Sequence, residues 1–220
     1  MIKYKVLSII THPLYYLKYR GMVLLSSIRG TKGNVFSPKK AIISKSKIRF
    51  AGKENTMSLE GCHIYNCDIL IQGDSLSLVI EKGVKLFNIR LKISGSGNTV
   101  HIGKGSSFGG GNIICGGKST QITIGENCML AEGLDLWNTD THSIIQNGEI
   151  FNAARSVSIG DNVWTGKDVA ILKGITVGDG AVIGMRAVVT HDVEPRSLNA
   201  GCPSRKIKDG VSWDLGESIG

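Results

Sequence analysis

A period of six residues runs through the chain from Ile159 to Pro195. An amphipathic helix would repeat its apolar residues every three to four positions, and a half-buried strand every two. A period of six favours a parallel β-helix, in which short flat strands form three faces and stacked coils bury rungs of aliphatic side chains. The residues that carry the period are Ile159, Thr165, Ile171, Val177, Ile183, Val189 and Pro195.

A longer repeat precedes this run. Residues 77–98, 99–120 and 121–142 align without gaps, so that Ile80, Ile102 and Ile124 occupy one rung position. The register then breaks and resumes at Val157. We therefore expect an all-β chain with three parts. They are a basic, partly helical N-terminal segment at 1–34, a parallel β-helix at 35–194 with an inserted loop at 143–156, and a C-terminal cap and tail at 195–220.

Positive charge is concentrated at the start of the chain. The net charge is +8, and twelve of the 26 Lys and Arg but none of the 18 Asp and Glu fall within residues 1–53. Such a segment suits contact with anionic lipid or an anionic polymer, or has no partner at all. We expect no nucleic-acid partner.

The first thirty residues allow two interpretations. Leu14, Leu17, Gly21, Leu25 and Ile28 fall on roughly one helical face after Pro13. This helix either plugs the open end of the solenoid or lies on the inner membrane surface. Polar residues interrupt every window long enough to span a bilayer, and no secretory signal is recognisable.

The five cysteines are odd in number and scattered, which favours a reduced, cytoplasmic setting over a disulfide framework. Cys62, His63 and Cys67 have the side chains of a zinc site, but no second pair of ligands follows at the required spacing. We expect no metal.

The segment Asn138-Thr-Asp-Thr-His142 carries the chemical signal. A histidine is the usual general base for deprotonating a hydroxyl near neutral pH. Asp140 or Asn138 would accept a hydrogen bond from the ring nitrogen that does not react, fixing the tautomer. A lone histidine is more often structural, and on these residues alone both interpretations stay open.

Four motifs taken together resemble the hexapeptide-repeat O-acetyltransferases. The Asn-Thr-Asp-x-His segment and the 22-residue coils are most similar to the polysialic acid O-acetyltransferases of bacterial capsules, and the galactoside and maltose O-acetyltransferases are also similar. The resemblance covers about residues 77–213. Its motifs are Gly125-Glu-Asn-Cys-Met-Leu-Ala131, Asn138-Thr-Asp-Thr-His142, Ile159-Gly-Asp-Asn-Val-Trp-Thr-Gly166 and Ala200-Gly-Cys-Pro-Ser-Arg205.

This resemblance implies a left-handed β-helix that assembles as a homotrimer and binds acetyl-CoA in a groove between neighbouring prisms. It implies that His142 deprotonates a sugar hydroxyl, which attacks the thioester directly without an acyl-enzyme. Trp164 is expected to line the same site from the adjacent subunit, with Asp140 and Asn138 beside the base.

The resemblance also implies a set of cofactor contacts. The backbone near Met185 and Arg186 would meet the pantetheine, and Arg205, Lys208 and His191 would meet the CoA phosphates. Family members often have small residues in place of Met185 and Arg186 and a lysine in place of His191. The full expected set is Trp164, Lys167, Lys173, Met185, Arg186, Thr190, His191, Arg205 and Lys208.

Acceptor contacts are expected at Trp137 and, in the inserted loop, at Ile145, Glu149 and Phe151. Our leading hypothesis is an acetyl-CoA-dependent O-acetyltransferase acting on a bacterial capsular or lipopolysaccharide-type polysaccharide or its precursor. It would work in the cytoplasm, with peripheral contact to the inner membrane surface left open. One alternative is an acetyltransferase for a small sugar, nucleotide sugar or amino sugar. Another is a trimeric β-helix that binds without catalysing.

Overall fold

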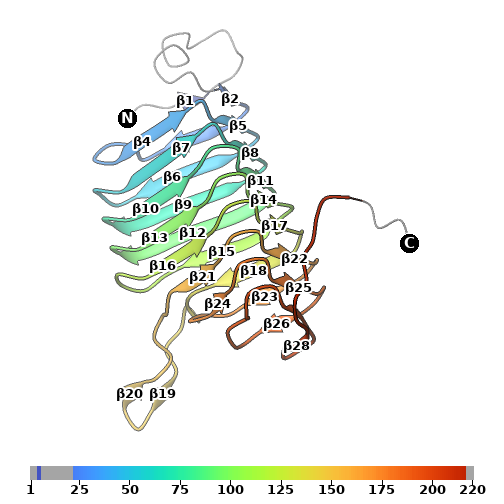
Figure 1. Cartoon of the computed structure of the whole chain (residues 1–220). Helices are drawn as coiled ribbons and strands as arrows, with labels where there is room; N and C mark the ends of the chain where they lie inside the picture. The colour runs from blue at the N-terminus through green and yellow to red at the C-terminus, as the bar shows by residue number, and fades with distance from the viewer. Residues whose placement is uncertain (1–3, 6–21, 217–220) are drawn as a thin grey trace.

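A computed structural model describes residues 4–5 and 22–216 of the chain. Every regular element that it describes is a β-strand, and the strands stack into a three-sided parallel solenoid (Figure 1). Each full coil contributes one strand to each of three sheets, which we call A, B and C and define below. Along the chain the strands enter these sheets in the order C, B, A. The three edges of the prism are therefore a C/B corner, a B/A corner and an A/C corner.

All three sheets run along the same solenoid, but they contain different numbers of strands. Sheet A contains β1 (Tyr4–Lys5), β3 (Ser27–Arg29), β6 (Lys47–Ala51), β9 (Asp68–Asp74), β12 (Ile89–Ser96), β15 (Gly111–Cys115), β18 (Leu134–Trp137), β23 (Ala170–Ile171) and β26 (Val188–Val189). Sheet C contains β4 (Val35–Lys39), β7 (Thr56–Glu60), β10 (Ser77–Ile80), β13 (Thr99–Ile102), β16 (Gln121–Ile124), β21 (Val157–Ile159) and β24 (Thr176–Val177). Sheet B contains β2 (Met22–Leu24), β5 (Ile42–Ser44), β8 (His63–Tyr65), β11 (Lys85–Phe87), β14 (Ser107–Phe108), β17 (Met129–Leu130), β22 (Trp164–Thr165), β25 (Val182–Ile183), β27 (Leu198–Ala200) and β28 (Arg205–Lys208).

Coil length changes along the solenoid. Ile80 pairs with Ile102 and Ile102 with Ile124, as the 22-residue repeat predicts. Beyond the insert the spacing shortens, and Ile159 pairs with Val177. The extra residues of the long coils extend sheet A, where β12 has eight residues and β23 has two.

The interior is a column of stacked aliphatic side chains. Ile159, Ile171, Ile183 and the other members of the six-residue period point inward and are buried, including Thr165. Pro195 is the exception, because it is exposed at the C/B corner after the last complete coil. The period therefore predicts the buried rung positions correctly up to Val189, but it wrongly predicts one further buried position, at Pro195.

The solenoid begins earlier than residue 35. Strands β2 and β3 already belong to sheets B and A, and an exposed Leu25 with a positive φ of 48° turns the corner between them. Leu25 and Ile28 therefore lie in a turn and a strand and not on a helical face. The remainder of the expected helix, at residues 6–21, lies outside the described residues. Among the described residues, no helix has the length and apolar character needed to cross a bilayer.

Two elements depart from the stack. The insert forms an antiparallel hairpin, β19 (Ile145–Gln146) and β20 (Glu149–Ile150), which projects away from the prism (Figure 1). At the C-terminal end, β28 pairs antiparallel with β27 and closes sheet B. Within the cap, the Trp213 indole packs against Trp164, with ring centroids 6.3 Å apart.

Candidate active site

His142 lies at the A/C corner, five residues after β18 ends, where the chain leaves the solenoid for the insert. Its backbone N–H donates to the Asp140 carbonyl oxygen at 2.7 Å. The imidazole is exposed, and no described residue hydrogen-bonds to it. The ring is thus free to meet a substrate or a second protein chain.

Asn152, a buried residue, holds the backbone that carries this histidine. Its Nδ2 donates to Asp140 Oδ2 at 2.7 Å and to the His142 carbonyl oxygen at 2.8 Å. Its Oδ1 accepts from the Ile144 N–H at 2.6 Å. One side chain therefore ties together three alternate residues of the segment. Sequence reasoning missed Asn152, because its partners lie eight to twelve residues earlier and no local pattern connects them.

Lys173 completes this clamp. Its ammonium group pairs with the Asp140 carboxylate and donates to the Asn152 carbonyl oxygen at 3.0 Å. Its side chain is only 15% exposed. The hydrogen bond from Lys173, aided by the one from Asn152, holds the pKa of Asp140 below its usual range. Lys173, which we expected among the cofactor contacts, is therefore engaged at the base of the insert.

The expected orienting groups do not reach the imidazole. Asp140 is occupied by Lys173 and Asn152, as described above. Asn138 is fully buried, accepts from the Gly116 N–H at 2.7 Å, and donates to Thr120 Oγ1 at 2.8 Å. Asn138 thus stabilises the corner of the coil, and Asp140 acts on the backbone near His142 and not on its ring.

Trp164 lies on a different side of the prism. It is the first residue of β22, on the flat outer face of sheet B, and is 40% exposed. His142 lies at the A/C corner, which is the corner opposite that face. Within one chain the two side chains cannot meet across the buried core.

Beside Trp164, the B/A corner carries the expected pantetheine contacts. Met185 is exposed, and a Cβ added to Gly166 would come within 2.7 Å of the Met185 backbone nitrogen. The Arg186 N–H donates to the Lys167 carbonyl oxygen at 2.8 Å. The Lys167 ammonium pairs with Glu132, and this bond raises the pKa of the lysine. The structure brings Lys167, Met185 and Arg186 together on successive coils.

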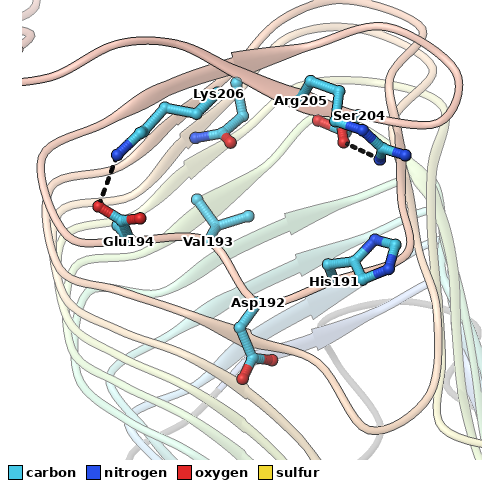
Figure 2. A pocket seen from close by; sticks show the side chains of 8 residues that line it. His191, Asp192, Val193, Glu194, Ser204, Arg205 and Lys206 are labelled. Atoms are coloured by element: carbon cyan, nitrogen blue, oxygen red, sulfur yellow. Dashed lines mark hydrogen bonds and ion pairs between the residues drawn. The ribbon is translucent and has the colours of Figure 1, made fainter.

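The expected phosphate contacts gather at the end of the solenoid around a pocket of about 350 Å³. Figure 2 shows Arg205 and His191 on one side of it and the Lys206–Glu194 ion pair on the other. Thr190 Oγ1 lies 2.9 Å from His191 Nδ1, and Arg205 Nη1 donates to the Ser204 carbonyl oxygen at 2.9 Å. The lining residues are His191, Asp192, Val193, Glu194, Asn199, Ser204, Arg205 and Lys206.

Lys208 lies nearby on β28 and does not line this pocket. Sequence reasoning missed Ser204, Glu194 and Lys206 as pocket residues. The reason is that the fold of the cap, and not any repeat, brings β28 back over the last coil.

The expected acceptor contacts separate into two places. Ile145, Glu149 and Phe151 lie on or beside the projecting hairpin, where Ile145 is 65% and Phe151 is 61% exposed. Trp137 lies on β18 and is half-buried, with its Nε1 3.3 Å from Asp135 Oδ1. The hairpin therefore presents apolar side chains close in sequence to His142.

The cysteines form no part of these groups. Burial raises the pKa of Cys62 to about 12 and that of Cys67 and Cys115 to about 11, and it also raises the pKa of Cys128. Only the thiolate is a good nucleophile, so these four thiols are poor candidates for covalent catalysis. No group of three or more potential metal ligands occurs within the part of the chain that the structure describes.

Comparisons with known proteins agree with this architecture. Residues 156–191 match the family model for bacterial transferase hexapeptide (six repeats). The polysialic acid O-acetyltransferase of Neisseria meningitidis is 30% identical over 151 residues, which cover 67% of this chain and 69% of that protein. The galactoside O-acetyltransferase of Escherichia coli K12 is 35% identical over 116 residues, covering 51% and 55% respectively. Among solved structures, the polysialic acid O-acetyltransferase OatWY superposes with a TM-score of 0.81 at 26% identity, covering 90% of this chain and 94% of that one.

Proposed function

This chain belongs to the hexapeptide-repeat acetyltransferases, and from that premise we propose that it transfers an acetyl group from acetyl-CoA to a hydroxyl of a bacterial surface polysaccharide or its precursor. The observation that carries the proposal is the His142 imidazole. It is exposed at a corner of a rigid prism, on a backbone that Asn152 and Lys173 hold in place. A general base needs both freedom to reach a substrate and a fixed position.

The working unit is a homotrimer. Arg205 pairs with Ala200, which stacks on Gly184 beside Met185, so Arg205 lies at the same B/A side of the prism as Met185 and Lys167. His142, in contrast, lies at the A/C corner, and Trp164 lies on sheet B. One site contains both side chains only if the A/C side of one protomer faces the sheet B side of another.

In the proposed reaction, the His142 imidazole takes the proton of the acceptor hydroxyl. The hydroxyl oxygen bonds to the acetyl carbonyl carbon as the carbon–sulfur bond breaks, and the proton passes to the departing thiolate. Direct transfer needs no protein nucleophile, which agrees with the raised pKa values of the buried thiols.

The residues present fit the donor. At the B/A corner the coils stack closely, because a Cβ added to Gly166 would lie 2.7 Å from the Met185 backbone nitrogen and one added to Gly184 would lie 3.0 Å from Ala200 Cβ. Cations at His191, when protonated, and at Arg205 suit phosphate, because charge-assisted bonds are the strongest hydrogen bonds. Lys206 contributes less, since Glu194 and Asp209 already pair with it.

For the acceptor, two relatives act on carbohydrates according to their names, and one of them acts on a polymer of acidic sugars. Twelve basic and no acidic residues within 1–53 suit an anionic polymer. A cytoplasmic location, and contact of residues 1–30 with the inner membrane surface, stay predictions.

An acceptor panel tests the proposal by measuring CoA release. Turnover that depends on an acidic polysaccharide such as polysialic acid supports it. Turnover only with free sugars, nucleotide sugars or amino sugars supports the small-acceptor alternative. Absence of turnover with every acceptor, although acetyl-CoA binds, supports a non-catalytic β-helix.

Mixed oligomers test the shared site. His142→Ala and Trp164→Ala chains, each inactive alone, are expected to regain part of the activity when co-expressed, because some interfaces then pair an intact His142 with an intact Trp164. A mixture as inactive as its parts would contradict a site built between subunits.

A further inference from the structure

Sheet B carries a line of outward-facing residues that leads away from Trp164. The pairings Trp164–Met129, Met129–Ser107 and Ser107–Lys85 place one of these residues on each successive coil. Neighbouring strands lie about 4.8 Å apart, so Lys85 is roughly 14 Å from Trp164 along the prism. This direction runs toward the basic N-terminal coils.

Beside Lys85, two aromatic rings lie exposed on adjacent coils. Tyr65 pairs with Phe87 in the ladder, both are 37% exposed, and their ring centroids are 6.3 Å apart. The Lys45 ammonium donates to Tyr65 Oη at 3.1 Å and lies 5.3 Å from the centre of that ring. We call Lys45, Tyr65 and Phe87 the aromatic platform.

The same column is lined by small residues on later coils. On later coils, the position level with Phe87 is held by Gly109, Ala131, Gly166 and Gly184. In the same ladder, the Ala131 N–H donates to the Thr165 carbonyl oxygen. The surface is therefore low beside Trp164 and Met185 and rises at Phe87. The platform thus forms the N-terminal end of this low surface.

We propose that the aromatic platform binds sugar units of an acidic polysaccharide, a more distant unit of which is acetylated near Trp164. This inference rests on the proposed function and assigns a second contact region to its acceptor. Exposed aromatic rings offer flat apolar area to a sugar face, and Lys45 and Lys85 offer charge to its carboxylates. A distance of about 14 Å exceeds one sugar ring, so only an oligomer or polymer reaches both places.

A Tyr65→Ala/Phe87→Ala double variant tests the platform. The KM for long-chain polysialic acid is expected to rise about tenfold, since two aromatic contacts are lost. The KM for acetyl-CoA, the kcat at saturating polymer, and the kcat/KM for a single-sugar acceptor are expected to stay at wild-type values. Val35→Ala is the matched control, because Val35 is an exposed apolar residue on sheet C, in the coil before that of Tyr65.

Titration of polysialic acid without acetyl-CoA separates this inference from the proposed function. Binding that weakens in the double variant supports the platform even if the wild-type protein acetylates another acceptor. An unchanged KM and unchanged binding would overturn the platform. So would a change in oligomeric state, which would identify Tyr65 and Phe87 as a contact between subunits.

Discussion

The coils before the insert, residues 22–137, and the part from residue 138 to 208 share one interior but use their polar residues differently. Both stack aliphatic rungs, such as Ile102 in the first part and Ile171 in the second. In the long coils, buried asparagines at the A/C corner bond to backbone groups of their own and the next coil. Asn55 Nδ2 donates to the Gly73 carbonyl oxygen, and its Oδ1 accepts from the Leu76 N–H.

After residue 138, the asparagine that makes such bonds, Asn152, lies beside an exposed functional group. Asn152 makes the same kinds of bond as Asn55, but its partners include the His142 carbonyl oxygen. Similar residue types therefore serve stability in one part and position a candidate base in the other. The first three of the following predictions compare a residue of the second part with a counterpart in the first, and the fourth concerns Asp140 in the second part alone.

The largest effect is expected at the two histidines. His142→Ala should lower kcat by a factor on the order of 10² to 10⁴, the usual effect of losing a general base, while acetyl-CoA binding survives. His101, paired with Glu81 at 2.9 Å on sheet C, is the counterpart. His101→Ala should leave kcat unchanged in the same steady-state assay. Full activity of the His142→Ala variant would refute the assignment of the base.

The two asparagines should differ next. Asn152→Ala should lower kcat by roughly 10- to 100-fold with little change in either KM, because a small displacement of a catalytic group costs that much. Asn55→Ala should reduce the free energy of unfolding by about 1–3 kcal/mol, the cost of leaving buried partners unsatisfied, without lowering kcat. Denaturant titration and kinetics on both variants check this pair. Equal losses of kcat would mean that Asn152 acts only through stability.

Two arginines provide the third comparison. Arg205→Ala should raise the KM for acetyl-CoA about tenfold, because a charge-assisted bond to phosphate is lost. Arg49, which pairs with Asp68 at 2.6 Å on sheet A, should tolerate the same change with no effect on that KM. Measuring the same KM with dephospho-CoA derivatives would show whether Arg205 contacts the phosphate that these derivatives lack. An unchanged KM in Arg205→Ala would exclude a phosphate contact there.

The smallest effect concerns pH. The pKa of Asp140 is lower in the folded state than its ordinary value near 3.9, so its carboxylate stabilises the fold above that value. This contribution is lost as pH falls through the folded pKa. Asp140→Asn should therefore be less stable than wild type at neutral pH, and the difference should begin to shrink below about pH 4 and disappear only below the folded pKa. A difference that persists in acid would show that charge is not its cause.

The sequence predicts the fold well where a pattern repeats. Burial at each rung follows from the six-residue period, because every coil meets the same neighbours as the coil before it. The period continues to Pro195 only in sequence, since after Val189 the chain turns into the cap. The early start at Met22 was missed because β2 and β3 are short and lack a clear repeat.

The candidate site was less predictable for a physical reason. His142 could be proposed from its motif, but the contacts that fix its backbone come from Asn152 and Lys173 on later segments. Side chains that meet across coils carry no local pattern. The same applies to Trp213, whose position on Trp164 depends on the path of the cap along sheet B.

The insert is fastened at its root, where Asn152 and Lys173 hold Asp140, and its tip extends freely from the prism. Mutations at the tip can therefore accumulate without disturbing the imidazole. We therefore propose that changes in this arm, whose root is fixed, alter the choice of acceptor while the chemistry of transfer stays the same.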